Sequence, residues 1–446
     1  MLSTKATKAT KATKTTKHRT ALTAALLAAV TATALLAAVT ATALLAAVTA
    51  TALPAAVAAP AAPRTEGVSV TPAGKAANDR SAGAVLSRDG RFAAFDSEAT
   101  DLVAGDTNGA RDIFVRDLRT GRTERIALAG RQVSGPSLSA DGRYVAFVSS
   151  PADSSSDRDV RLYDRRTRKV ERLDVELPDG YPGDGAGSVS LSADARYAVL
   201  TTDGPRFDGT AVFLRDRKAG TTEKVSHPYT GGDGERDAHS PTVSDDGRRV
   251  VYATSFVNGP RGDDWSDLWL RDRGTGQVTQ IDRSHDGSRT EKESLAPSIS
   301  GDGRTVVFES RDTHLVPNDD DAAWNVFVHD IATGTNQRVH GTQGGPGEVY
   351  TRAPAISADS RHLTFVSELA EPGSTYGKEW PVYLRDLKEG GTTLVAPDTA
   401  GGAATATVAP GGISAGARRI AFLSGDETLL SGDTNDGDDA FVRRLR

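Results

Sequence analysis

One short pattern recurs seven times along the chain, and this repetition constrains the fold more than any other feature of the sequence. Each copy has a short apolar stretch ending in Ser, then a turn, an Arg, and a run rich in β-branched and aromatic residues. The copies lie at 85–95, 137–147, 190–200, 242–252, 298–308, 355–365 and 412–422. Their starts are 52 to 57 residues apart, so each unit is large enough for one supersecondary structure in a repeat architecture.

A second signature follows in each of the first six units, as in DIFVRDLRTG (112–121) and DLWLRDRGTG (267–276), and then one more short strand. Apolar and polar residues alternate in these runs, as half-buried strands require. Asp-Gly in Ser-x-Asp-Gly-Arg and Thr-Gly in Asp-x-x-Thr-Gly both favour tight hairpin turns. The sequence therefore predicts an all-β fold, a seven-bladed β-propeller with four antiparallel strands per blade. Ala195, Ser360 and Ala417 replace the first turn's Gly, which predicts slight strain there.

The last unit stops at 440–446, before a fourth strand could form. The segment RTEGVSV (64–70) matches the outer strand RTERIAL (122–128) of the first unit. We expect the N-terminal segment to close the ring, with Val68 and Val70 in a strand paired with 440–445, because an open edge would otherwise remain.

The paired motifs Ser-x-Asp-Gly-Arg-x-x-Ala-Phe and Ile-Phe-Val-x-Asp-x-x-Thr-Gly resemble the repeat of TolB-like (WD-like) β-propellers over residues 64–446. Members of that family include periplasmic partner-binding proteins, propellers attached to peptidases, and exported proteins of unknown role. The resemblance implies the fold and an exported location, but it implies no particular function, because sites are added to folds.

The first 63 residues differ in composition from the rest of the chain. Six basic residues and no acid precede an uncharged stretch at 21–53, in which LLAAVTATA occurs three times. This order is typical of a signal peptide. We predict a signal and Ala/Pro-rich leader at 1–63 with cleavage near Ala58, a propeller at 64–446, and secretion. The length of the apolar stretch also allows an uncleaved membrane anchor.

Charge and cysteine content limit the function classes. Without the six leader bases, 47 Lys+Arg face 59 Asp+Glu, a net charge of −12, which is unfavourable for nucleic-acid binding. The chain has no Cys, so disulfides and thiol chemistry are excluded. We expect a monomer without stable membrane insertion once the signal is cleaved.

Three loops between the second and third strands place acidic and amide side chains at positions one, three and seven. The residues are Asp106, Asn108 and Asp112; Asp319, Asp321 and Asn325; and Asp433, Asn435 and Asp439. Closely spaced oxygen ligands of this kind suit Ca²⁺. The Glu expected at position twelve is absent, and Asx-turns explain the same residues. Ca²⁺ sites and structural turns are the two interpretations.

Catalytic motifs are not recognisable. The Gly-x-Ser-x-Gly at 412–416 places Ser414 in register with the turn serines of the other six copies, so we interpret it as structural. No His-Glu-x-x-His pair occurs. His239 and His285 are the best candidates for a lyase, on loops that we expect to be equivalent.

Loops before the first strand and after the second must share one face of the ring, opposite the two tight turns. These loops vary in length and carry the aromatic residues Trp265, Trp324, Tyr376 and Trp380. Such residues suit contacts with sugars or proteins, and loops on a rigid scaffold often carry function. The sequence predicts an exported, non-catalytic binding module for a protein or a cell-envelope glycan. A polysaccharide lyase or glycosidase-type enzyme is the alternative.

Overall fold

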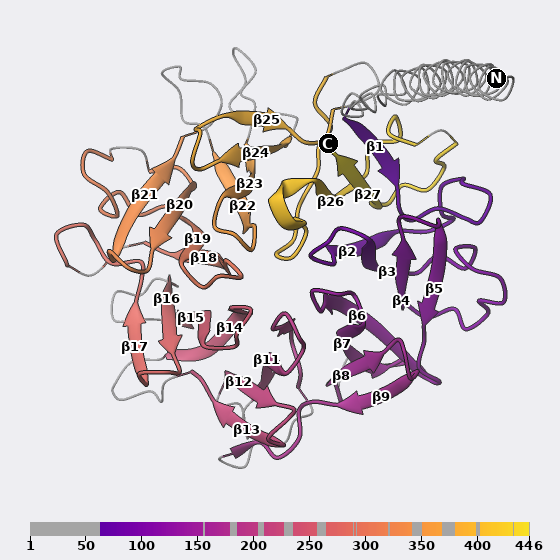
Figure 1. Cartoon of the computed structure of the whole chain (residues 1–446), viewed down its shortest axis with the longest axis horizontal. Helices are drawn as coiled ribbons and strands as arrows, with labels where there is room; N and C mark the ends of the chain where they lie inside the picture. The colour runs from indigo at the N-terminus through magenta and orange to yellow at the C-terminus, as the bar shows by residue number, and fades with distance from the viewer. Residues whose placement is uncertain are drawn as a thin grey trace, which may run out of the picture. The chain divides into compact units, whose positions relative to one another are not determined.

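The computed structural model is a ring of seven β-sheets, the blades, around a central channel (Figure 1). It describes residues 63–154, 157–178, 185–203, 209–226, 235–256, 265–288, 290, 292–319, 322–340, 350–367, 380–397, 402–430 and 432–445. All of the predicted leader except its last residue, Pro63, lies outside these residues. None of the helices in the described part is long and apolar enough to cross a membrane.

Six blades are antiparallel sheets of four strands, ordered from the channel outward. Blade one contains β2 (Ser81–Leu86), β3 (Phe92–Ser97), β4 (Asp112–Asp117) and β5 (Arg122–Ile126). Blade two contains β6 (Arg131–Leu138), β7 (Tyr144–Pro151), β8 (Asp159–Asp164) and β9 (Lys169–Arg172). Blade three contains β10 (Val189–Leu191), β11 (Tyr197–Asp203), β12 (Thr210–Asp216) and β13 (Thr221–Lys224).

The next three blades repeat this order. Blade four contains β14 (Glu235–Val243), β15 (Arg249–Phe256), β16 (Trp265–Asp272) and β17 (Gln277–Gln280). Blade five contains β18 (Ser294–Ile299), β19 (Thr305–Ser310), β20 (Asn325–Asp330) and β21 (Thr335–Val339). Blade six contains β22 (Thr351–Ile356), β23 (His362–Ser367), β24 (Val382–Asp386) and β25 (Thr392–Leu394).

Blade seven closes the ring with a strand from the other end of the propeller. Its sheet has the order β1-β27-β26, where β1 is Arg64–Gly67, β26 is Arg419–Ser424 and β27 is Asp439–Arg444. Its innermost position is held by two isolated bridges, Thr407 to Leu423 and Ile413 to Ile420. A short 3-10 helix, η3 (Ala415–Ala417), precedes β26.

The predicted closure is confirmed, but the strand ends earlier than expected. Gly67 pairs with Phe441 as the last residue of β1. Val68 donates its N–H to the Ala440 carbonyl (2.7 Å) outside the strand, and Val70 forms an isolated bridge with Ala76. Both valines are buried, so they anchor the seam by packing instead of by extending the sheet.

The Ser-x-Asp-Gly-Arg motif works as one hydrogen-bonded turn. In blade one, Ser87 Oγ donates to Asp89 (2.7 Å) and accepts from the Phe92 N–H (2.9 Å), while the Arg91 N–H donates to Asp89 (2.9 Å). Gly90 has φ +70°. The residues that replace this Gly have the same left-handed backbone, with φ 55° at Ala195, 59° at Ser360 and 49° at Ala417, a conformation that disfavours side chains.

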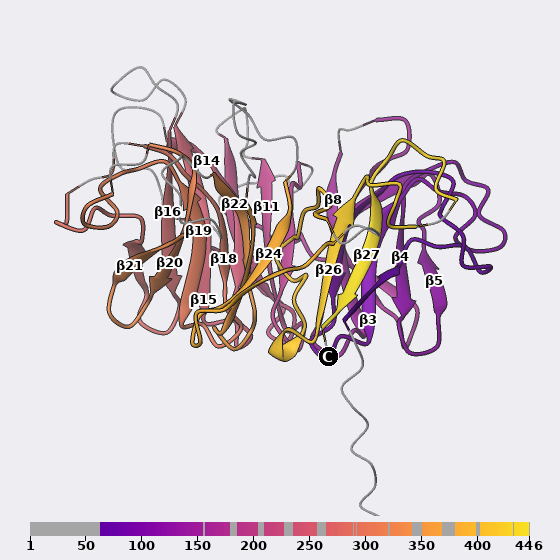
Figure 2. The same ribbon diagram turned by 90° about the horizontal axis from the view of Figure 1, so that it is seen from above.

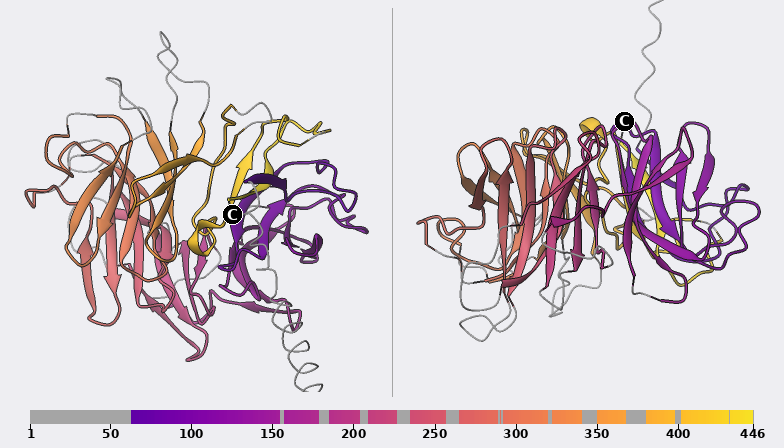
Figure 3. Two further views of the ribbon diagram at one scale, coloured as in Figure 1. Left: turned by 45° about the horizontal axis from the view of Figure 1, so that its top comes forward. Right: turned by 90° about the horizontal axis from the view of Figure 1, so that it is seen from below.

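The hydrophobic core lies between neighbouring blades. One buried cluster joins Phe95 and Phe114 of blade one to Ala421, Ala440 and Val442 of blade seven. Figures 2 and 3 show the consequence for the faces, because the strands run across the thickness of the ring. The tight turns lie at one edge, which we term the turn face. The connections between second and third strands lie at the other edge, the loop face.

Candidate functional site

At the turn face, the second residues of six of the seven Ser-x-Asp turns line a cavity in the channel. The cavity there is about 130 Å³ and is lined by Arg88, Ala140, Ala193, Asp245, Gly301 and Ala358. Backbone hydrogen bonds connect these turns between blades, for example Arg88 N–H to Ala140 O (2.9 Å) and Ala140 N–H to Ala193 O (2.8 Å). The turns thus form a bonded rim.

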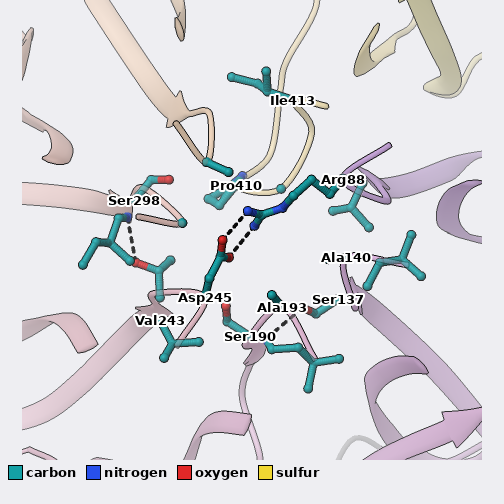
Figure 4. Close-up of a pocket in the computed structure, with 18 of the residues that line it drawn as sticks. Arg88, Ser137, Ala140, Ser190, Ala193, Val243, Asp245, Ser298, Pro410 and Ile413 are labelled. Atoms are coloured by element: carbon teal, nitrogen blue, oxygen red, sulfur yellow. Dashed lines mark hydrogen bonds and ion pairs between the residues drawn. The ribbon is translucent and has the colours of Figure 1, made fainter. Parts of the chain in front are cut away.

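An ion pair crosses this rim. The Arg88 guanidinium of blade one donates two hydrogen bonds to the Asp245 carboxylate of blade four (Figure 4). Both side chains are about one third exposed, at 35% and 29%. The sequence reasoning missed this pair. The repeat does contain a sign of it, because the position that holds Arg88 and Asp245 in two copies holds Ala or Gly in the other five.

Two hydroxyl groups along the channel accept hydrogen bonds from the backbone of the neighbouring blade. The Leu191 N–H donates to Ser137 Oγ and the Ile299 N–H donates to Thr242 Oγ1, each at 3.1 Å (Figure 4). These hydroxyls therefore connect the innermost strand of one blade to that of the next.

Three of the four predicted aromatic residues, Trp265, Trp324 and Trp380, lie where third strands begin, at the loop face. Trp324 directly precedes β20 and is half-buried. Its ring lies under the guanidinium of Arg352, 4.7 Å from the ring centroid, with Arg311 at 5.9 Å. Trp380 stands near the start of β24 and packs in part against the core of blades six and seven.

Two of the four predicted aromatic side chains are not described. The backbone of Trp265 begins β16 opposite Phe256, but its side chain lies outside the described part of the structure. Tyr376 lies entirely outside the described residues.

A larger concavity of about 670 Å³ lies between blades four and five. Its lining includes Arg249, His285, His329 and Asn336. His329 is buried and its Nδ1 is 2.8 Å from Asn336 Oδ1. Burial lowers the pKa of His329, and its contact with Asn336 lies within blade five. The sequence reasoning did not find this groove.

The acidic loop of blade one is filled by a guanidinium. Arg125 of β5 lies 2.8 Å from Asp106 and donates to Asp112 from Nε at 2.6 Å. Asn108 also donates to Asp112 (3.1 Å). Burial raises the pKa of Asp112, although Arg125 opposes this shift. The cation at this loop is therefore an arginine side chain.

The acidic loop of blade five is neutralised in the same way as that of blade one. Arg338 of β21 lies 2.5 Å from Asp319. Asn325 donates to the Ala323 carbonyl (3.1 Å), and Asp321 lies outside the described residues.

Blade seven differs from both. Asp439 is fully buried, and its Oδ1 accepts from Ser69 Oγ (2.6 Å). Asn435 donates to Asp433 (3.1 Å) and to the Ala77 carbonyl (3.0 Å). Burial, together with the charge of Asp433, raises the pKa of Asp439 to about 6. In the described ranges there is no group of three or more His, Cys, Asp or Glu side chains able to hold a metal ion.

The remaining candidates from the sequence have structural contacts. Ser414 Oγ accepts from the Arg419 N–H (2.9 Å), as the turn serine of its repeat. His239 lies within β14 instead of on a loop, with its Nε2 2.7 Å from Ser255 Oγ. His285 Nδ1 is 2.9 Å from the His314 carbonyl oxygen. The expectation that the two histidines lie on equivalent loops was wrong, because the first strand of blade four is longer than the pattern suggested.

No protein-family model and no curated protein matches the sequence. Among solved structures, an oligogalacturonate lyase from Vibrio parahaemolyticus has a TM-score of 0.55 at 12% identity, covering 86% of this chain and 97% of that one. The β-propeller domain of the Trilobed protease from Pyrococcus furiosus has a TM-score of 0.52 at 13% identity, covering 83% and 96%.

TolB from Acinetobacter baumannii is 20% identical over 60% of this chain and 55% of that chain, with a TM-score of 0.39. At such identities the similarity shows the propeller fold alone. The seven-bladed architecture agrees with the propeller that the repeat predicts.

Proposed function

We propose that the chain is an exported, non-catalytic propeller that binds a protein or a cell-envelope glycan on its loop face. The leader at 1–63 would direct export and be cleaved near Ala58, with retention as a membrane anchor as the alternative. The mature propeller would act as a monomer, and Ca²⁺ is its candidate cofactor.

The observation that carries this proposal is the repeated placement of Trp on the loop face. Trp324 and Trp380 each stand next to the start of the third strand in adjoining blades, and both are half-buried. Trp324 is flanked by two arginines. Partly exposed aromatic rings next to cations can stack on sugar rings or anchor a protein partner at modest entropic cost.

The contacts at the turn face support a binding module over an enzyme. Arg88 and Asp245 neutralise each other across the channel, and Ser137 and Thr242 accept hydrogen bonds from the neighbouring blades. Groups that are already bonded in this way stabilise the ring and would have to break those contacts to act on a substrate.

A polysaccharide lyase or glycosidase-type enzyme is the second candidate. It is favoured by the shared fold with oligogalacturonate lyase, which is an argument by analogy only. Such an enzyme needs a base and an acid that converge on a substrate at one channel mouth.

Sedimentation with purified cell-wall glycan, and capture of envelope proteins from the producing cell, test the proposal. Trp324→Ala should weaken the interaction about tenfold or more, since a central aromatic contact is worth about 2 kcal/mol. Arg119→Ala, on an exposed tight turn of the turn face, is the matched control and should bind as the wild type does.

The result that contradicts the proposal is weaker binding in Arg119→Ala with unchanged binding in Trp324→Ala. Release of unsaturated sugar ends from an acidic polysaccharide would instead favour the lyase.

A further inference from the structure

Blade seven repeats the acidic loop of blade one without the arginine that neutralises it. Strand pairing shows the equivalence. Arg125 is opposite Phe114 in blade one, and Arg338 is opposite Phe327 in blade five. In blade seven, the residue opposite Phe441 is Gly67. The side chain that supplies a positive charge in two blades is therefore absent in the third.

In the described residues, the carboxylates of blade seven have no basic partner. Among the described residues, neither Asp433 nor Asp439 forms an ion pair with Arg or Lys. Asp439 is 0% exposed, and its Oδ2 has no hydrogen-bond partner. Its other oxygen is occupied by Ser69. A buried carboxylate in this state is unfavourable unless a cation or a proton compensates it.

We propose that the loop 433–439 binds one Ca²⁺ ion, and that the equivalent loops of blades one and five bind none because a guanidinium occupies each. The carboxylates of Asp433 and Asp439 supply two ligands. Backbone carbonyls and water complete the oxygen shell that Ca²⁺ requires.

The position of this site couples Ca²⁺ to ring closure. The loop belongs to the C-terminal hairpin, yet its contacts reach the N-terminal segment. Asp439 accepts from Ser69, Asn435 donates to the Ala77 carbonyl (3.0 Å), and the Ser81 N–H donates to the Asp438 carbonyl (2.7 Å). An ion that orders this loop also holds the two ends of the propeller together.

Thermal unfolding of the purified, chelator-treated protein tests the proposal. Ca²⁺ at about 100 times its Kd should raise the melting temperature by about 3–5 °C, because the ion binds the folded state. Asp433→Asn should lose this gain. Asp433 is partly exposed, so the variant is expected to fold.

The matched control is Asp106→Asn, the equivalent change in blade one. This variant should start from a lower melting temperature and keep the full gain with Ca²⁺. No gain in the wild type, or a gain that survives Asp433→Asn, would overturn the proposal. So would loss of the gain in Asp106→Asn, or an equal gain with Mg²⁺ at the same concentration.

Discussion

Blade one and blade seven come from the same repeat but differ where the ring must close. Blade one carries its own outer strand, β5, while blade seven takes β1 from the opposite end of the propeller. The acidic loop is neutralised by Arg125 in blade one, and Gly67 stands at that place in blade seven. Blade seven has thus lost local contacts of the repeat and depends on contacts between distant segments.

The largest effect should follow from removing the borrowed strand. Deletion of residues 60–72 removes β1 and the buried Val68 and Val70. Loss of the two valines alone should lower the free energy of unfolding by about 3–6 kcal/mol, and the melting temperature by many degrees. Calorimetry of the deletion variant measures this effect, with Arg64→Ala as a control at an exposed position of β1. An unchanged melting curve would show that blade seven does not need its borrowed strand.

Arg125→Ala would make the loop of blade one resemble that of blade seven. Asp106 and Asp112 would then be buried without their cation, and stability in a chelator should fall by about 3–5 kcal/mol. Ca²⁺ should restore part of the loss, because the variant creates a second site. Arg122→Ala, an exposed change in the same strand, should stay within about 0.5 kcal/mol of the wild type.

Urea unfolding with and without Ca²⁺ gives the free energy of unfolding of both variants and of the wild type. Equal losses for Arg125→Ala in the two conditions would mean that the loop has no affinity for the ion.

The smallest expected effect is on the stability of the fold at low pH. The hydrogen bond from Arg91 holds the pKa of Asp117 at about 2, below the value of about 3.9 for an unfolded chain. This lowered pKa stabilises the fold fully above about pH 4, and the contribution disappears as the pH falls towards about 2. In blade seven Arg444 takes the place of Asp117, so that blade lacks this acid-sensitive pair.

Urea midpoints of Asp117→Asn and the wild type should therefore differ near pH 6 and converge near about pH 2. A constant difference across this range would contradict the role of the pair.

The repeat made the propeller predictable because its residues act within one turn. Ser87, Asp89 and Gly90 belong to a hydrogen-bonded turn that spans residues 87–92, so their spacing alone indicates the hairpin. The loop pattern of Asp106, Asn108 and Asp112 was visible for the same reason.

The partners of these groups were not predictable in the same way. Arg125 becomes the cation of its loop only once β5 pairs with β4. Arg88 and Asp245 are 157 positions apart and meet only across the closed channel. The strand β1 ends at Gly67, and Val68 and Val70 are buried just beyond it, which an alternating pattern does not reveal.

The number of Ca²⁺ ions bound per chain tests the central claim most directly, namely that the three similar loops differ because an arginine fills two of them. Native mass spectrometry or equilibrium dialysis of the chelator-treated protein gives this number. The structure predicts one ion, lost in Asp433→Asn and retained in Asp106→Asn. Three ions, no ion, or one ion that remains bound in Asp433→Asn would contradict the account.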